Sequence, residues 1–216
     1  MNSFWKRIAD AFYPEGITCD LCDAELVDND DRKLGLCASC YGQLKKVKTD
    51  KERIGGCDVL SLYEYDSVRD LILRSKDNDM PYLTKTIARL LARYYKSAGL
   101  SVDAVTYVPC SKKNLKRRGY DHMRYVAEEF CALTGLTLSD ALRRVKETAD
   151  QTQVDADKRY ENVRGGFVCA SESLQGTRVL LIDDLVTTGA TLSACIAALR
   201  SAYPEQIVCL TLGRSS

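Results

Sequence analysis

The sequence predicts an α/β domain with a parallel sheet and helices on both faces, together with a small N-terminal zinc-binding module. Short apolar runs alternate with segments of helical periodicity from about residue 58 onward, which favours a doubly wound parallel sheet. The run 179–182 is apolar throughout, as in a strand buried on both faces. Two Cys-x-x-Cys pairs near the N-terminus predict the module, and 216 residues suffice for one domain and a small appendage.

Composition and targeting signals restrict the location of the protein. The formal net charge is +1, so the overall charge indicates no particular class of partner. The sequence has no apolar run of about 18 residues, and residues 1–14 lack the apolar core of a secretion signal. We therefore expect no membrane span and a cytoplasmic location. In a reducing cytosol, the ten cysteines are more typical of metal binding than of disulfides.

The N-terminal module is predicted from Cys19, Cys22, Cys37 and Cys40. Each pair places two thiolates on one tight turn, and two pairs supply the four thiolates of a tetrahedral Zn²⁺ site. Four thiolates close the coordination shell, so we expect a structural zinc, whereas redox chemistry would need one pair only. Apolar residues at helical spacing between positions 4 and 12 predict a docking helix upstream.

The domain boundary is expected where the charge pattern changes. Acidic residues around the cysteines give way to a basic stretch, and Gly55-Gly56 follows it. We therefore expect the helix and zinc module at residues 1–53 and the main domain at residues 54–216.

The elements of the main domain follow from apolar periodicity and from the turns between the periodic segments. Strands are predicted at residues 58–65, 102–108, 179–182 and 207–212, and helices at residues 68–74, 83–95, 121–133 and 192–199. The basic stretch 112–118 is predicted as a loop that ends at Gly119. It follows the turn Pro109-Cys110-Ser111-Lys112 at the carboxyl end of a strand, where open α/β sheets bind ligands.

The most specific feature is the segment that follows the apolar run 179–182. Two adjacent carboxylates, Asp183 and Asp184, precede the turn Thr187-Thr188-Gly189-Ala190-Thr191, after which a helix is predicted. A helix N-terminus presents free N–H groups, threonine hydroxyls add donors, and Gly189 allows close approach, so the turn suits a phosphate. Carboxylates in front of a phosphate site suit a ribose 5-phosphate. A Walker-type P-loop is excluded, because no lysine follows the glycine.

This segment resembles the 5-phosphoribosyl-1-pyrophosphate (PRPP) signature of the type I phosphoribosyltransferases. The resemblance implies that Asp183 and Asp184 hold the ribose hydroxyls during catalysis, while Thr187, Thr188, Gly189, Ala190 and Thr191 hold the 5-phosphate. It also implies Mg²⁺ on the oxygens of PRPP, reached by Asp183 or Asp184 directly or through water. Ser111 and Lys112 are expected to contact the pyrophosphate through backbone N–H groups and the ammonium group.

Four blocks, in the same order, resemble the ComF-type competence proteins. They are the two cysteine pairs; Tyr65-x-x-Val68-Arg69-x-x-Ile72 with Lys76 and Asp79; Val108-Pro109 with Arg118-Gly119-Tyr120-Asp121-His122; and Gln151 with Arg159, Asn162-Val163 and Phe167 ahead of the PRPP motif. Two departures stand out: Ser111 replaces a proline, and Tyr-Asp-His at 120–122 replaces Phe-Asn-Gln. His122 is open to two interpretations, a surface or helix-start residue and a catalytic residue.

The ComF resemblance implies a type I phosphoribosyltransferase fold and a role in DNA uptake during natural transformation. The partners it implies are a helicase-like competence ATPase, a recombination mediator and single-stranded DNA. Residues 151–167 resemble the lid of amidotransferase-type enzymes, which would bring Gln151 and the catalytic Arg159 over the site. The basic stretch 112–118 suits either a DNA backbone, with Tyr120 for base stacking, or pyrophosphate.

Two classes of function therefore remain open. One is a ComF-like protein that binds PRPP and Mg²⁺ and acts in DNA uptake or processing. The alternative is a phosphoribosyltransferase that acts on an unknown nucleobase or amine acceptor in nucleotide metabolism, without a DNA role.

Overall fold

The computed structural model describes residues 17–27, 29–49, 51–76, 82–145, 165–171 and 174–215. It divides into two compact units, Met1–Leu44 and Lys45–Ser216. The predicted boundary between residues 53 and 54 stays a prediction. The docking helix predicted between residues 4 and 12 lies outside the described residues.

The smaller unit is built from turns and two short helices around the cysteine pairs. An antiparallel bridge between Thr18 and Glu25 closes the first turn, which contains Cys19 and Cys22. The helices are α2 (Asn29–Leu34) and α3 (Ala38–Gly42). Cys37 caps α3, because its sulfur accepts a hydrogen bond from the Cys40 N–H at 3.4 Å. The second pair therefore lies on the first turn of a helix.

The larger unit contains a six-stranded sheet in the order β1-β2-β8-β7-β3-β4. The strands are β1 (Lys51–Ile54), β2 (Cys57–Glu64), β8 (Gln206–Arg214), β7 (Arg178–Val186), β3 (Ala104–Tyr107) and β4 (Thr137–Leu138). Within this sheet β1 pairs antiparallel with β2, and the other described neighbours are parallel. The central strands β7 and β8 are almost wholly buried, which explains their continuous apolar runs.

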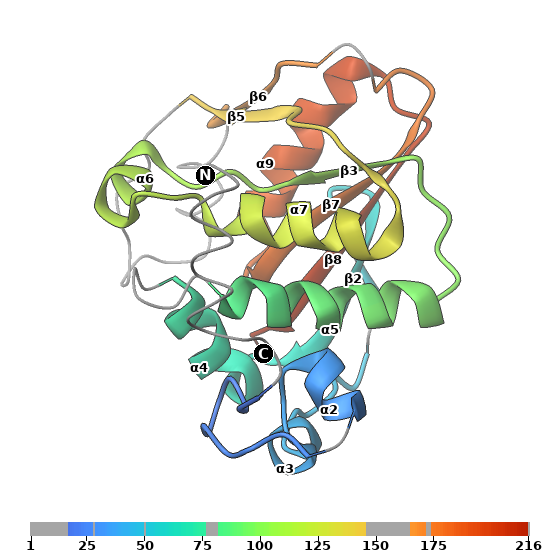
Figure 1. Cartoon of the computed structure of the whole chain (residues 1–216). Helices are drawn as coiled ribbons and strands as arrows, with labels where there is room; N and C mark the ends of the chain where they lie inside the picture. The colour runs from blue at the N-terminus through green and yellow to red at the C-terminus, as the bar shows by residue number, and fades with distance from the viewer. Residues whose placement is uncertain are drawn as a thin grey trace. The chain divides into compact units, whose positions relative to one another are not determined.

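Helices cover both faces of this sheet (Figure 1). On one face lie α4 (Tyr65–Ser75), α5 (Leu83–Ser97) and α7 (His122–Thr134), and α5 packs along α7. On the other face, α9 (Ala190–Leu199) shares a buried cluster with residues of β2, β3, β7 and β8. A small hairpin of β5 (Leu142–Arg144) and β6 (Phe167–Cys169) packs against α9. The predicted fold class is confirmed.

The predicted strands and helices are present, with two informative differences. Residues 112–118, predicted as a loop, form the helix α6 (Lys112–Arg118). The Ser111 hydroxyl accepts a hydrogen bond from the Asn114 N–H at 3.1 Å, and Gly119, at φ +76°, ends the helix. The second difference is that β7 continues through Asp183 and Asp184 to Val186, so the carboxylates lie within the strand. No helix among the described residues is long and apolar enough to cross a membrane.

Candidate functional site

The candidate site lies where several elements of the larger unit end or begin. The acidic pair lies in the last part of β7, and Gly189 leads directly into α9. Contacts of Asp184 with Lys76 and His122 bring the end of α4 and the start of α7 to the same place. The parallel order of β3, β7 and β8 collects these segments at the carboxyl edge of the sheet.

Asp184 is the centre of this site, because two side chains contact the same oxygen, Oδ2, of its carboxylate. Lys76, the residue that follows α4, places Nζ 2.8 Å from this oxygen. His122, the first residue of α7, places Nε2 2.5 Å from the same oxygen. The Asp184 and His122 side chains are buried, at 9% and 7% exposure. Burial disfavours ionisation of Asp184, but Lys76 and His122 outweigh it and hold the pKa of this carboxyl below its usual range.

Asp183 has different surroundings from Asp184, although the two are adjacent. Its Oδ1 accepts a hydrogen bond from the Asp184 N–H at 3.0 Å. Burial, and secondly the negative charge of Asp184, raise the pKa of Asp183 well above its usual range. After burial, the Asp183 charge is the largest influence that raises the pKa of the Cys195 thiol, which lies on α9. Val179 and Leu181 of β7 belong to the buried cluster that contains Cys195 of α9, and strand alternation places Asp183 on the same face, whereas Asp184 contacts His122 at the start of α7.

The turn between β7 and α9 requires glycine at position 189. Gly189 has φ +76°, and a Cβ atom there would lie 2.7 Å from Cδ1 of Ile54 on the neighbouring β1. The Ala190 N–H points to the Thr188 hydroxyl at 3.4 Å, and Thr187 is exposed. Thr191 lies in the first turn of α9 and is half-buried. The predicted phosphate-binding residues thus surround a helix N-terminus, as expected from the sequence.

The predicted pyrophosphate turn is held in place by Asp121. The Asp121 carboxylate accepts hydrogen bonds from the Cys110 N–H at 2.9 Å and from the Met123 N–H at 3.1 Å. It therefore caps α7 and fixes the turn after β3 together. Because the Ser111 hydroxyl caps α6, its side chain has a structural role, while Lys112 is exposed at the start of that helix. Sequence reasoning missed the role of Asp121, although an acidic residue before a helix is a capping signal.

His122 is a helix-start residue, as one of the two interpretations had it, but it is buried rather than on the surface. Its Nδ1 is buried and has no hydrogen-bond partner within the described part of the chain. Tyr120 lies two residues before His122. Its hydroxyl donates a hydrogen bond to the Ser75 carbonyl at 2.8 Å, and its ring contacts Tyr125 edge-on. Gln151 and Arg159, the predicted lid residues, lie outside the described residues.

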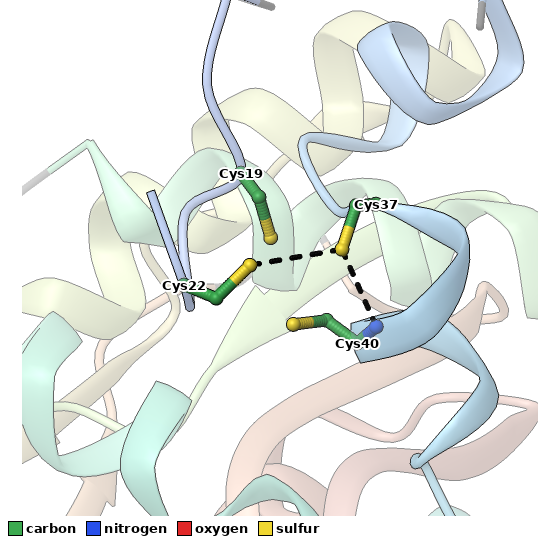
Figure 2. Close-up of side chains that lie close together, drawn as sticks. All are labelled: Cys19, Cys22, Cys37 and Cys40. Carbon is green, nitrogen blue, oxygen red and sulfur yellow. Dashed lines mark hydrogen bonds between the residues drawn. The ribbon is translucent and has the colours of Figure 1, made fainter. Parts of the chain in front are cut away.

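The four cysteines of the smaller unit form a second candidate site (Figure 2). Their sulfur atoms all lie within 4.8 Å of one another, and the Cys22 and Cys37 sulfurs are 3.7 Å apart. A tetrahedral zinc with Zn–S bonds of about 2.3 Å requires sulfurs about 3.8 Å apart, so the donor set and its spacing fit such an ion. The hydrogen bond from the Cys40 N–H lowers the pKa of Cys37 to about 7, whereas burial and the neighbouring cysteine side chains raise the pKa of Cys40. The cysteines therefore could hold a metal ion.

Comparison with known proteins agrees with this architecture. The model of the phosphoribosyl transferase domain family matches residues 78–215. Competence protein F of Haemophilus influenzae is 26% identical over 85% of this chain and 92% of its own length. DNA utilization protein YhgH of Salmonella typhimurium is 30% identical over 56% of this chain. The match covers 54% of the length of YhgH, about half. The resemblance to ComF-type proteins is thereby confirmed.

One of the similar solved structures is that of the allosteric regulatory enzyme of purine biosynthesis. It is 19% identical and has a TM-score of 0.43. The match covers 60% of this chain but only 26% of that enzyme, so the chain spans about a quarter of its length.

Proposed function

Because this chain belongs to the phosphoribosyl transferase domain family, we propose that its acidic pair and its threonine turn bind PRPP. The observation that carries the proposal is the position of Asp184 one short turn before the N-terminus of α9. A carboxylate can accept hydrogen bonds from ribose hydroxyls, and the helix N-terminus with Thr187, Thr188 and Thr191 can bind the 5-phosphate. Both features lie at the carboxyl edge of the sheet, where ligands of open α/β sheets bind.

The reaction that such a site would support is displacement of pyrophosphate from ribose C1. A nucleophilic atom of the acceptor forms a bond to C1 while the bond between C1 and the pyrophosphate oxygen breaks. Negative charge accumulates on the leaving pyrophosphate, so cations must be positioned near it. Lys112 is the proposed cation of the turn after β3, and Arg159 the proposed cation of the lid. The carboxylates suit Mg²⁺, which prefers oxygen ligands and would neutralise part of the pyrophosphate charge when bound.

The biological role that we propose is DNA uptake or processing in the cytoplasm; similarity to a competence protein and to a DNA utilization protein supports a role with DNA. A surface that supports this role is α6, where Lys112, Lys113, Lys116 and Arg117 are exposed and Arg118 is half-buried. Closely spaced cations suit the phosphates of single-stranded DNA. A helicase-like competence ATPase and a recombination mediator are the proposed protein partners. We also propose that the four cysteines hold a structural Zn²⁺.

The test of PRPP binding uses thermal unfolding with and without PRPP and Mg²⁺. Binding to the native state should stabilise it by about 2.7 kcal/mol when PRPP is at about 100 times Kd. The double variant Asp183→Asn, Asp184→Asn should retain the fold and lose this shift. A double variant that binds PRPP as tightly as wild type would refute the assignment of the site.

Release of pyrophosphate distinguishes a phosphoribosyltransferase from a ComF-like adaptor, by which we mean a protein that binds PRPP and DNA without catalysing a reaction. PRPP is incubated with the protein alone, with candidate nucleobases or amines, and with single-stranded DNA. Acceptor-dependent release without DNA binding would favour the alternative, a phosphoribosyltransferase of nucleotide metabolism. DNA binding without turnover would favour the ComF-like adaptor.

A further inference from the structure

We propose that the larger unit has a second ligand site, a pocket at the amino edge of its sheet that binds a small phosphate monoester with hydroxyl groups. A sugar phosphate and a nucleoside monophosphate share this chemistry. Arg53 and Arg200 hold the phosphate. The pocket lies at the opposite edge of the sheet from the proposed PRPP site, so this inference does not rest on the proposed function.

The pocket has a volume of about 340 Å³, within the range of about 300–1,000 Å³ that is typical of small-molecule sites. The first two residues of β2, Cys57 and Asp58, line it together with the first two residues of β8, Gln206 and Ile207. Because β2, β8 and β7 are parallel neighbours, the pocket lies at their amino ends, whereas Asp184 lies near the carboxyl end of β7. A ligand in this pocket therefore cannot occupy the candidate site described above.

Two guanidinium groups from distant parts of the chain meet beside this pocket. Arg53 lies on β1, and Arg200 follows the last residue of α9. Arg53 donates a hydrogen bond to the Gly56 carbonyl at 2.5 Å, and Arg200 donates one to the Gly55 carbonyl at 2.6 Å. Both side chains are thus attached to one two-residue turn, the link between β1 and β2.

This turn is a rigid anchor for the two arginines. A two-residue hairpin turn with positive φ at both positions suits glycine, and Gly55 and Gly56 have φ +56° and +79°. The turn packs against α9, where a Cβ atom at position 55 would lie 3.5 Å from Ile196 Cδ1. Each guanidinium has five N–H donors, so donors remain for a ligand, and both arginines are exposed. Side chains that are already held in place lose less entropy when a ligand binds.

The charge at this turn favours an anion. Arg53 and Arg200 repel each other, and within the described ranges of the chain neither forms an ion pair with a carboxylate. Asp58, in the pocket wall, is paired with Lys51 at 2.9 Å. A phosphate monoester carries nearly two negative charges at neutral pH and has three acceptor oxygens, and guanidinium groups bind such oxygens in pairs. One phosphate therefore matches two arginines better than one carboxylate does.

The other side chains of the pocket indicate what the phosphate is attached to. Glu205 and Gln206 also line the pocket, and both are exposed. The Glu205 carboxylate would repel a second phosphate, but it can accept hydrogen bonds from hydroxyl groups. The Gln206 amide can both donate and accept. The lining therefore favours a single phosphate on a hydroxylated body over a polyphosphate.

The experiment measures Kd by calorimetry for inorganic phosphate, glycerol 3-phosphate, ribose 5-phosphate and adenosine monophosphate. Arg53→Gln and Arg200→Gln should each weaken binding of the monoesters about tenfold, because each removes charge-assisted hydrogen bonds. Arg143→Gln, which removes an exposed cation from β5, is the matched control and should leave Kd unchanged. The tighter of ribose 5-phosphate and adenosine monophosphate identifies the source of the monoester as a sugar phosphate or a nucleotide.

A second variant tests the body of the ligand. Glu205→Gln removes a charged acceptor of hydroxyl groups and a charge that repels phosphate. It should therefore lower the preference for glycerol 3-phosphate over inorganic phosphate, and an unchanged preference would refute the role of Glu205. Urea unfolding shows whether each variant folds. If a glutamine variant does not fold, Arg53→Lys and Arg200→Lys, which keep the charge but not the paired donors, should still weaken monoester binding.

Three outcomes would overturn the inference. The first is that no monoester binds to wild type. The second is that monoester binding survives both arginine variants and is lost in the double variant Asp183→Asn, Asp184→Asn, which would place the ligand at the carboxyl edge. The third is that single-stranded DNA alone depends on the two arginines, which would make this surface a nucleic-acid contact. Absence of PRPP binding would refute the proposed function and leave this site unaffected.

Discussion

His122 Nε2 lies 2.5 Å from Asp184 Oδ2, so the start of α7 is joined to the acidic pair of β7 by a single short contact. Together with the ion pair from Lys76, this contact makes Asp184 the meeting point of three segments that are distant in sequence. The neighbouring Asp183 has a different partner, since its Oδ1 accepts a hydrogen bond from the Asp184 N–H of β7 itself. The site is therefore asymmetric, although its motif is two identical residues.

Zinc binding is predicted to depend on all four cysteines of the smaller unit. Purified protein should contain one Zn²⁺ per chain, and Cys37→Ser should lose it and destabilise this unit, because metal binding and folding are coupled. Elemental analysis and thermal unfolding measure the two effects. Cys169→Ser is the control, since Cys169 lies on β6 and its thiol contacts the Ser171 carbonyl. Protein purified without chelator that contains no zinc would contradict the prediction.

Gly189→Ala should destabilise the larger unit and abolish PRPP binding. The added Cβ would meet Ile54 Cδ1 at 2.7 Å and would sit at φ +76°, a strain of about 1–3 kcal/mol. Gly176→Ala is the matched control, because it has φ +67° but no atom within 4 Å of the added Cβ. Urea unfolding should show a larger loss of stability for position 189.

The second-site variant Ile54→Val removes the closest atom and should restore part of the stability of Gly189→Ala. A Gly189→Ala protein as stable as Gly176→Ala would show that the close packing against β1 does not matter.

The basic helix α6 should bind single-stranded DNA through its cations. The triple variant Lys116→Ala, Arg117→Ala, Arg118→Ala should weaken binding uniformly across sequences. The slope of log Kd against log salt concentration should fall by about 0.7 for each phosphate that these cations no longer neutralise. Fluorescence anisotropy at several salt concentrations measures both quantities. PRPP should compete with DNA if the two sites overlap.

The control for α6 removes the same charge elsewhere, with Lys45→Ala, Lys46→Ala, Lys48→Ala, at three positions before β1. If both triple variants bind DNA like wild type, α6 does not bind DNA and the enzyme interpretation gains support.

The ion pair between Asp103 and Arg178 should make stability depend on acid pH. The Arg178 guanidinium and N–H lower the pKa of Asp103 to about 2, below its ordinary value of about 3.9 in an unfolded chain. Because the folded pKa is the lower one, the stabilisation is complete above about pH 5 and is lost as pH falls towards 2. Asp103→Asn should therefore lower Tm at neutral pH, and its difference from wild type should shrink over this range. Asp70→Asn, on the exposed side of α4, should show no such trend.

The sequence determined the features that depend on short spans of chain. The apolar runs located β2, β7 and β8, the helical periodicity located α5 and α7, and the cysteine spacing predicted the cluster of four sulfurs. The acidic pair and threonine turn were found because their chemistry is contained in one short run of consecutive residues, 183–191. The helix α6 also has local signals in the sequence, Ser111 at its start and Gly119 at its end. The stretch was predicted as a loop because its high density of positive charge suggested a ligand-binding loop.

Only the tertiary structure decided how the site is assembled. The parallel order of strands brings Lys76 and His122 to Asp184, although His122 is 62 residues away in sequence. The same order places Ile54 of the edge strand against Gly189, and Asp121 against the turn after β3. No local pattern encodes these contacts, because they depend on which strands are neighbours and on which face each side chain points to. The alternation of the strand then gives the two aspartates different partners.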